Sequence, residues 1–115
     1  MIDSILTSVK KMLGVDESDD NFDEELIMYI NGSLMVMTQL GVGPTEGFFI
    51  TSVKNTWSEL LGDRTDLNLV LGDVYLRTRL IFDPPTNSFL VASIDRQIVE
   101  YDWRIAAWHT PQVEV

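Results

Sequence analysis

Apolar residues recur at spacings of three and four along five stretches of the chain, the pattern of amphipathic helices. The first stretch ends at Gly14, a residue type that often follows the last helical turn. The second begins near Asp20 or Asn21, inside an acidic run that complements a helix N-terminus, and ends before Gly41. The predicted helices cover residues 2–13, 20–40, 55–61, 66–82 and 87–108.

An Asn31-Gly32 dipeptide interrupts the second pattern, and such a dipeptide can also mark a hairpin turn. Helical periodicity continues on both sides of it, so we interpret Gly32 as a close-packed or bent position inside a helix, at a propensity cost of about 1 kcal/mol. The loop that follows contains three glycines and a proline. Its apolar run 48–50 is either a brief strand or a buried loop anchor.

The fourth and fifth helices carry the most apolar surface. The stripe on 66–82 is wide enough to predict burial on more than one side, and Pro84 and Pro85 end that helix. On the fifth helix, Ala92, Val99 and Ala106 are spaced by seven residues beside the main apolar stripe. We expect the small alanine side chains of this line to permit another helix to approach closely. Arg96–Glu100 and Glu100–Arg104 have the spacing of helical ion pairs.

The fold class that follows is all-α: a small helical bundle of about five helices with a short extended loop and an extended C-terminal tail. Residues 1–109 form one predicted helical domain, since no composition shift marks a boundary. Residues 110–115 are predicted to be a flexible tail. Their valines alternate with polar residues, as in a strand added to a partner's sheet.

Charge narrows the possible partners. The 115 residues carry a formal net charge of −10, from 18 acidic and 8 basic side chains. Tight nucleic-acid binding needs clustered Lys and Arg, and anionic membranes repel an acidic surface. No apolar run reaches the ~18 residues of a membrane span, and no signal-peptide core is present. We therefore expect a chain made in the cytoplasm without a membrane partner.

Catalytic and metal motifs are not found in the sequence. There is no cysteine, and the single histidine, His109, ends the last predicted helix, where capping is its usual role. The acidic run fails as a calcium loop, because registers from Asp16 or Asp19 both lack the required glycine and glutamate. We expect no enzyme activity and no cofactor. Trp57, Trp103 and Trp108 are interpreted as core or subunit-contact residues, so Trp103→Ala should destabilise either the fold or the assembly of subunits by several kcal/mol.

Two motifs near the C-terminal end, Leu80-Ile81-Phe82-Asp83-Pro84-Pro85 and Glu100-Tyr101-Asp102-Trp103-Arg104, point to a family. With Leu13-Gly14-Val15, Phe22-Asp23, Tyr29-Ile30-Asn31 and the exit Gln39–Pro44, their order resembles the head–tail connector (adaptor) proteins of long-tailed bacteriophages. The resemblance covers nearly the whole chain. It departs from the family in the region from Thr56 to Arg64, where composition matches better than individual residues.

The resemblance implies a non-enzymatic virion protein of the neck, at the head–tail interface, made in the bacterial host cytoplasm. Such subunits form a homo-oligomeric ring of about 12 copies (a 12-mer) under the portal protein, and the ring extends the DNA channel and docks the stopper or tail-completion protein. Contact with translocating DNA would be passive. The implied portal-binding residues are Trp108, His109, Pro111, Val113 and Val115, and the implied subunit-packing residues are Phe82, Pro84, Pro85, Ile98, Tyr101, Trp103 and Arg104.

The charge also allows a second hypothesis of a different class. An acidic helical regulator, or DNA mimic, could bind a basic host protein through the acidic run 16–25. That hypothesis predicts binding that weakens with added salt, because exposed charges are screened.

Overall fold

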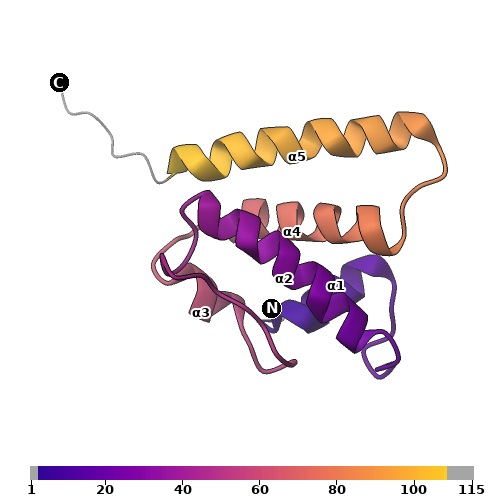
Figure 1. The fold of residues 1–115 in the computed structure, drawn as a ribbon, viewed down its shortest axis with the longest axis horizontal. Helices are drawn as coiled ribbons and strands as arrows, with labels where there is room; N and C mark the ends of the chain where they lie inside the picture. The colour runs from indigo at the N-terminus through magenta and orange to yellow at the C-terminus, as the bar shows by residue number, and fades with distance from the viewer. Residues whose placement is uncertain (1–2, 109–115) are drawn as a thin grey trace.

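A computed structural model describes residues 3–108, and this part of the chain is all-α, as predicted (Figure 1). No strand occurs among these residues, where the one extended pairing is an isolated bridge between Ser4 and Thr56. Each predicted helix is present, with ends displaced by a few residues. The helices are α1 (Ile5–Leu13), α2 (Asp23–Gln39), α3 (Trp57–Leu61), α4 (Leu67–Phe82) and α5 (Ser88–Trp108).

The first helix begins later than predicted. Ser4 is the N-cap of α1: its backbone is extended, and its side-chain oxygen accepts a hydrogen bond from the Thr7 amide at 3.2 Å. The bridge to Thr56 holds Ser4 in this conformation, so the chain ahead of Ile5 pairs with the residues before α3 instead of joining the helix. The predicted stop is confirmed, because Gly14 adopts a left-handed conformation with φ of 81°.

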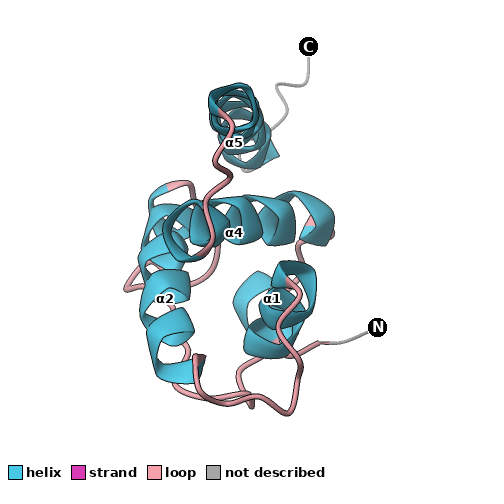
Figure 2. Ribbon diagram, turned by 90° about the vertical axis from the view of Figure 1, so that its right-hand side faces the viewer, coloured by secondary structure: helices cyan, strands magenta, loops and turns pink. Residues whose placement is uncertain are grey.

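Helix α4 lies at the centre of the bundle. It contacts α1 and α2 on one side and α5 on the other, which confirms the predicted burial on more than one side (Figures 1 and 2). Its buried line is Val70, Val74 and Thr78. Ile81, in the last turn of α4, is exposed.

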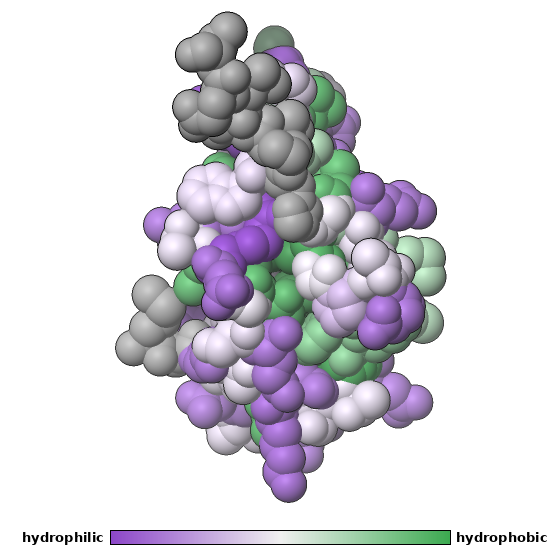
Figure 3. Space-filling model, turned by 90° about the vertical axis from the view of Figure 1, so that its left-hand side faces the viewer, coloured by the Kyte–Doolittle hydropathy of each residue, from purple (hydrophilic) through white to green (hydrophobic). Residues whose placement is uncertain are grey.

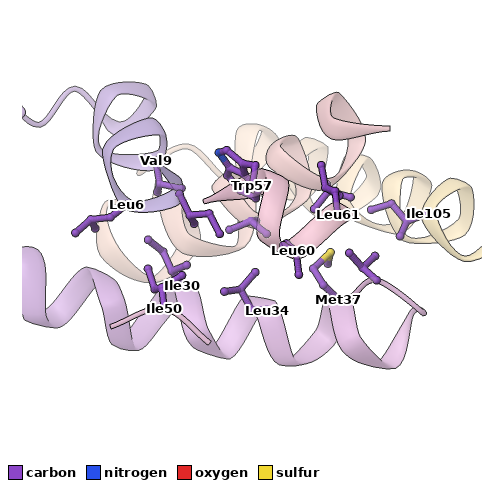
Figure 4. Packing of buried hydrophobic residues seen from close by; sticks show 14 of the residues in the cluster. Leu6, Val9, Ile30, Leu34, Met37, Ile50, Trp57, Leu60, Leu61 and Ile105 are labelled. Carbon is purple, nitrogen blue, oxygen red and sulfur yellow. The ribbon is translucent and has the colours of Figure 1, made fainter. Parts of the chain in front are cut away.

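The core fills the space between α1, α2, α3 and α4 (Figure 4). Trp57 is fully buried there, as predicted, and its indole Nε1 donates a hydrogen bond to Ser8 Oγ at 3.1 Å. Ile105 of α5 belongs to this cluster, and Tyr101 of the same helix packs against it. The labelled core residues are Leu6, Val9, Ile30, Leu34, Met37, Ile50, Trp57, Leu60, Leu61 and Ile105.

The loop between α2 and α3 is anchored by the buried side chain of Ile50, whereas Phe49 is half exposed, and the 48–50 run is not a strand. Asn31 holds it from the middle of α2. Its amide nitrogen donates to the Ile50 carbonyl at 3.0 Å, and its Oδ1 accepts from the Ile50 amide at 2.8 Å. Gly32 is the next residue of α2, and the predicted close packing at this position is wrong. A Cβ added there would meet no atom within 4 Å.

Helix α5 approaches α4 closely at Gly72. A Cβ at this position would lie 2.9 Å from the Tyr101 ring, so only glycine leaves room for it. The expectation that Ala92, Val99 and Ala106 permit the close approach is wrong, because all three are exposed. The face of α5 that meets α4 instead carries Ile94, Ile98 and Ile105, which recur at spacings of four and seven residues.

Candidate assembly surface

A groove of about 760 Å³ lies between α2, α4 and α5. It forms because α5 packs on α4 at a distance from α2, which leaves one side of all three helices open (Figure 2). Met28, Ile81 and Val99 are exposed apolar side chains among those lining it. Such a concave apolar surface is typical of a binding site. Its lining is Met28, Tyr29, Gly32, Ser33, Val36, Arg77, Leu80, Ile81, Asp95, Ile98, Val99 and Asp102.

An ionic network joins α4 to α5 beside the groove. Arg77 donates from Nε to Asp73 Oδ1 at 2.7 Å and from Nη2 to Asp102 Oδ2. Asp73 is completely buried, and burial, together with a hydrogen bond to Asp102, raises the pKa of its carboxyl to about 8 although Arg77 opposes the shift. The raised pKa favours the protonated form of Asp73 at neutral pH, and its hydroxyl can then donate a hydrogen bond to Asp102.

This network predicts a pH-dependent difference between the wild-type protein and Asp73→Asn. The folded Asp73 carboxyl binds a proton that the unfolded one, with a pKa of 3.8, releases. Its contribution to the free energy of unfolding is full below pH 3.8, falls by up to about 1.4 kcal/mol per pH unit above it, and is lost as the pH rises to about 8. Asparagine is always neutral and can make the same two hydrogen bonds.

Asp73→Asn should therefore gain stability relative to wild type as the pH rises from 5 to 8. Chemical denaturation at several pH values, followed by circular dichroism, measures the difference. Asp95→Asn, an exposed carboxylate on the same groove, is the control and should show no such slope. If the free energies of unfolding of wild type and Asp73→Asn changed with pH in parallel, the raised pKa of Asp73 would be contradicted.

The side of α5 turned away from α4 carries Trp103, whose side chain is 73% exposed. The core alternative is therefore wrong for Trp103, and the subunit-contact alternative stays a prediction. Trp103→Ala should leave the stability of the isolated fold almost unchanged. The predicted Glu100–Arg104 ion pair is confirmed at 2.8 Å. Arg96 does not make the predicted pair with Glu100; its guanidinium donates to Ser93 Oγ at 3.2 Å.

The residues predicted for subunit packing divide into three sets. Ile98 and Tyr101 lie between α4 and α5, and Phe82 packs edge-on against Phe22 with ring centroids 5.4 Å apart. These three act inside the subunit. Trp103 and Arg104 point outward and remain available to another chain. Pro84 and Pro85 form the turn between α4 and α5.

Of the predicted portal-binding residues, the structure places Trp108. It is half exposed at the end of α5 and borders a shallow hollow with Pro44, Leu60 and Arg64. Figure 3 shows one face of the molecule, on which hydrophobic surface lies between hydrophilic side chains. His109, Pro111, Val113 and Val115 lie outside the described residues.

Sequence reasoning did not assign Gly32 and Arg77 to a groove, nor Asp73 to the ionic network beside it. Of these three residues, only Gly32 could have been noticed in the sequence, because glycine inside a helix is less favourable than alanine and is therefore unusual there. In the part of the chain that the structure covers, no group of acidic or histidine side chains could hold a metal ion. Within residues 3–108, no helix has the length and apolar character needed to cross a bilayer.

The fold and its surfaces define a small helical protein with exposed apolar sites for other chains. Comparison with known families agrees: the family model for phage connector proteins matches residues 5–112. The chain belongs to the phage connector protein family. It is thus a structural connector of a bacteriophage and a virion component, in a family that is not enzymatic. No curated protein and no solved structure matches it.

Proposed function

We propose that this connector forms a closed ring beneath the portal protein, extends the DNA channel and docks the stopper or tail-completion protein. The family match over residues 5–112 carries the proposal. The surface supports it. A head-to-tail ring needs two different faces on each subunit, and this chain has both the groove and the outer side of α5 with Trp103.

Charge supports the channel role. The net charge of −10 disfavours retention of DNA, since binding depends on basic side chains that neutralise phosphates. Four of the eight basic residues, Lys10, Arg64, Arg77 and Arg104, also pair with carboxylates within the subunit. The basic surface available to DNA is therefore smaller than the composition implies, and contact with a translocating genome is passive.

The portal contact is assigned to the C-terminal end of the chain. Trp108 is the last described residue and is half exposed, which leaves its ring available to a partner. His109, Pro111, Val113 and Val115 follow it in sequence. Valines alternating with polar residues suit strand addition to a sheet edge, where backbone hydrogen bonds supply affinity.

The direct test is particle mass, measured by light scattering on the protein alone and mixed with the portal protein encoded by the same phage. A ring, free or formed only on the portal, is the expected result, and the mass gives the number of subunits. A protein that stays monomeric and ignores the portal at every concentration would overturn the proposal.

Removal of residues 110–115 should weaken portal attachment and leave the subunit folded. The six residues lie beyond α5, so helix content and melting temperature should match those of the full chain. Co-sedimentation with portal measures attachment. A variant carrying six Gly and Ser residues in their place controls for length, and normal attachment by the truncated chain would contradict the assignment.

A further inference from the structure

We propose that neighbouring copies join by placing the outer face of α5 of one copy, centred on Trp103, in the groove between α2, α4 and α5 of the next. The inference rests on the proposed ring and names the two surfaces that build it. Each surface is uncovered in the single subunit.

Helix α5 has two apolar faces, and residues 3–108 of its own chain cover only one of them. Ile94, Ile98 and Ile105 are buried toward α4. Val99 and Trp103, one turn apart, point roughly the opposite way at 3.6 residues per turn, and they are 67% and 73% exposed. A helix that is apolar on both sides is typical of one buried on both sides. Exposed tryptophan is also the residue type most enriched among the strongest contacts of protein interfaces.

The groove is kept open by Gly32. This glycine stands inside α2, where it costs about 1 kcal/mol relative to alanine. Its φ is not positive, and an added Cβ would meet nothing within 4 Å, so neither backbone conformation nor packing within the subunit requires it. A side chain here would project into the groove, which is the space that another chain needs.

Charge favours a second copy as the occupant. Two copies with a net charge of −10 repel one another unless exposed basic groups meet acidic ones. The hollow beside Trp103 is lined by Arg96 and Arg104 together with Asp95 and Glu100, and the groove carries Arg77 as well as Asp95 and Asp102. Arg104 pairs with Glu100, and Arg77 with Asp102, within the subunit. Among the described residues, Arg96 on the outer face and Asp95 on the groove make no salt bridge, so these two are the opposite charges that one copy can bring to the next. Steering of this kind falls with added salt.

The two surfaces lie on different sides of α5 and meet at Asp95 and Val99. A copy that inserts its Trp103 into a neighbour still has its own groove free for the next copy. Such head-to-tail contacts close into a ring when the rotation between copies allows it. A mutual contact, in which each of two copies fills the groove of the other, would stop at a dimer.

Two substitutions test the surfaces separately. Trp103→Ala removes the inserted side chain, and Gly32→Leu fills the groove; each should weaken self-association at least tenfold, measured by light scattering as the midpoint concentration of assembly. Melting temperature should not fall in either variant. Phe89→Ala, which removes an 82% exposed aromatic of the same helix outside both surfaces, is the matched control. Normal assembly by Trp103→Ala and Gly32→Leu would overturn the inference.

Cross-linking tests the direction of contact, because the chain has no cysteine of its own. Met28→Cys places a thiol on the groove, and Glu100→Cys places one beside Trp103. With a short bismaleimide, a mixture of the single variants should give a linked pair, and the double variant a ladder of products. A double variant that stops at the pair would instead show a mutual contact.

The same experiment separates failure of this inference from failure of the proposed function. Wild-type rings, free or on the portal, with no link between positions 28 and 100 would leave the connector ring standing and exclude these surfaces. A wild-type chain that never assembles, with or without portal, would contradict both this inference and the proposed function. Links that form equally well in Gly32→Leu would also exclude the groove.

Discussion

Replacing Lys10 with methionine is expected to lower the free energy of unfolding by about 3–5 kcal/mol, the range for removing one partner of a buried ion pair. Lys10 is only 2% exposed. Its Nζ donates to the carbonyl oxygens of Glu17 at 3.1 Å and Asp19 at 2.7 Å, and it lies 2.8 Å from Asp23 Oδ1. Methionine has a similar length but no donor, so these three oxygens would lose their partner.

Lys11→Met is the matched control, because Lys11 is the next residue of α1 and its side chain is exposed. We expect a change within about 0.5 kcal/mol there, as for most surface substitutions. Denaturant unfolding at pH 7, followed by circular dichroism, compares the two variants. If both variants lost the same free energy of unfolding, a basic residue near the end of α1 would matter for its charge alone.

The role of Lys10 shows what local sequence patterns miss. A lysine in the last turn of a helix is explained by the helix dipole, and the acidic run after it by solvation. In the structure that run folds back over Lys10, with Asp16 and Asp19 side chains accepting from the amides of Ser18 and Asn21. Lys10 bonds to carbonyls seven and nine residues away, and no periodicity or motif encodes such a contact.

Helix positions were predictable because their signals are local. Thr56 and Glu59 form a reciprocal capping box that starts α3, and Gly14 ends α1. The double proline separates α4 from α5 for an equally local reason. Such signals act within a few residues, so they survive without knowledge of the tertiary fold.

Surfaces were less predictable, because an apolar stripe does not say which chain will cover it. Tyr101 and Trp103 are two positions apart on α5, yet one packs over Gly72 and the other is exposed. Gly32 and Gly72 are likewise both helical glycines. One faces an open groove and the other an aromatic ring, a distinction that depends on where the neighbouring helix lies.

Arg64→Leu is the second substitution with a large expected effect, again about 3–5 kcal/mol. The Arg64 side chain is nearly buried and binds Asp66 at both carboxylate oxygens, at 2.9 Å from Nε and 2.6 Å from Nη2. It also donates to the carbonyls of Gly41 at 3.4 Å and Ile105 at 3.2 Å. Leucine would leave the Asp66 carboxylate buried without its cation, at the N-cap position of α4.

The bond to Ile105 gives Arg64 a second effect, on the end of α5. Hydrogen exchange should increase in the last turns of α5 of Arg64→Leu more than in α2, since release of the Ile105 carbonyl frees that end first. Arg104→Leu breaks an exposed pair with Glu100 and should cost less than about 1 kcal/mol. Arg64→Lys keeps the positive charge but cannot bind both carboxylate oxygens of Asp66 in the same way. Its loss of stability should lie between those of Arg64→Leu and Arg104→Leu.

The two readouts of Arg64→Leu separate a global effect from a local one. If stability falls and exchange rises evenly over all helices, Arg64 acts only as the partner of Asp66. If exchange rises first at the end of α5, the region from Thr56 to Arg64 also fixes the helix that carries Trp103 and Trp108. Portal attachment by the same variant should then fall at a temperature where the rest of the subunit is still folded.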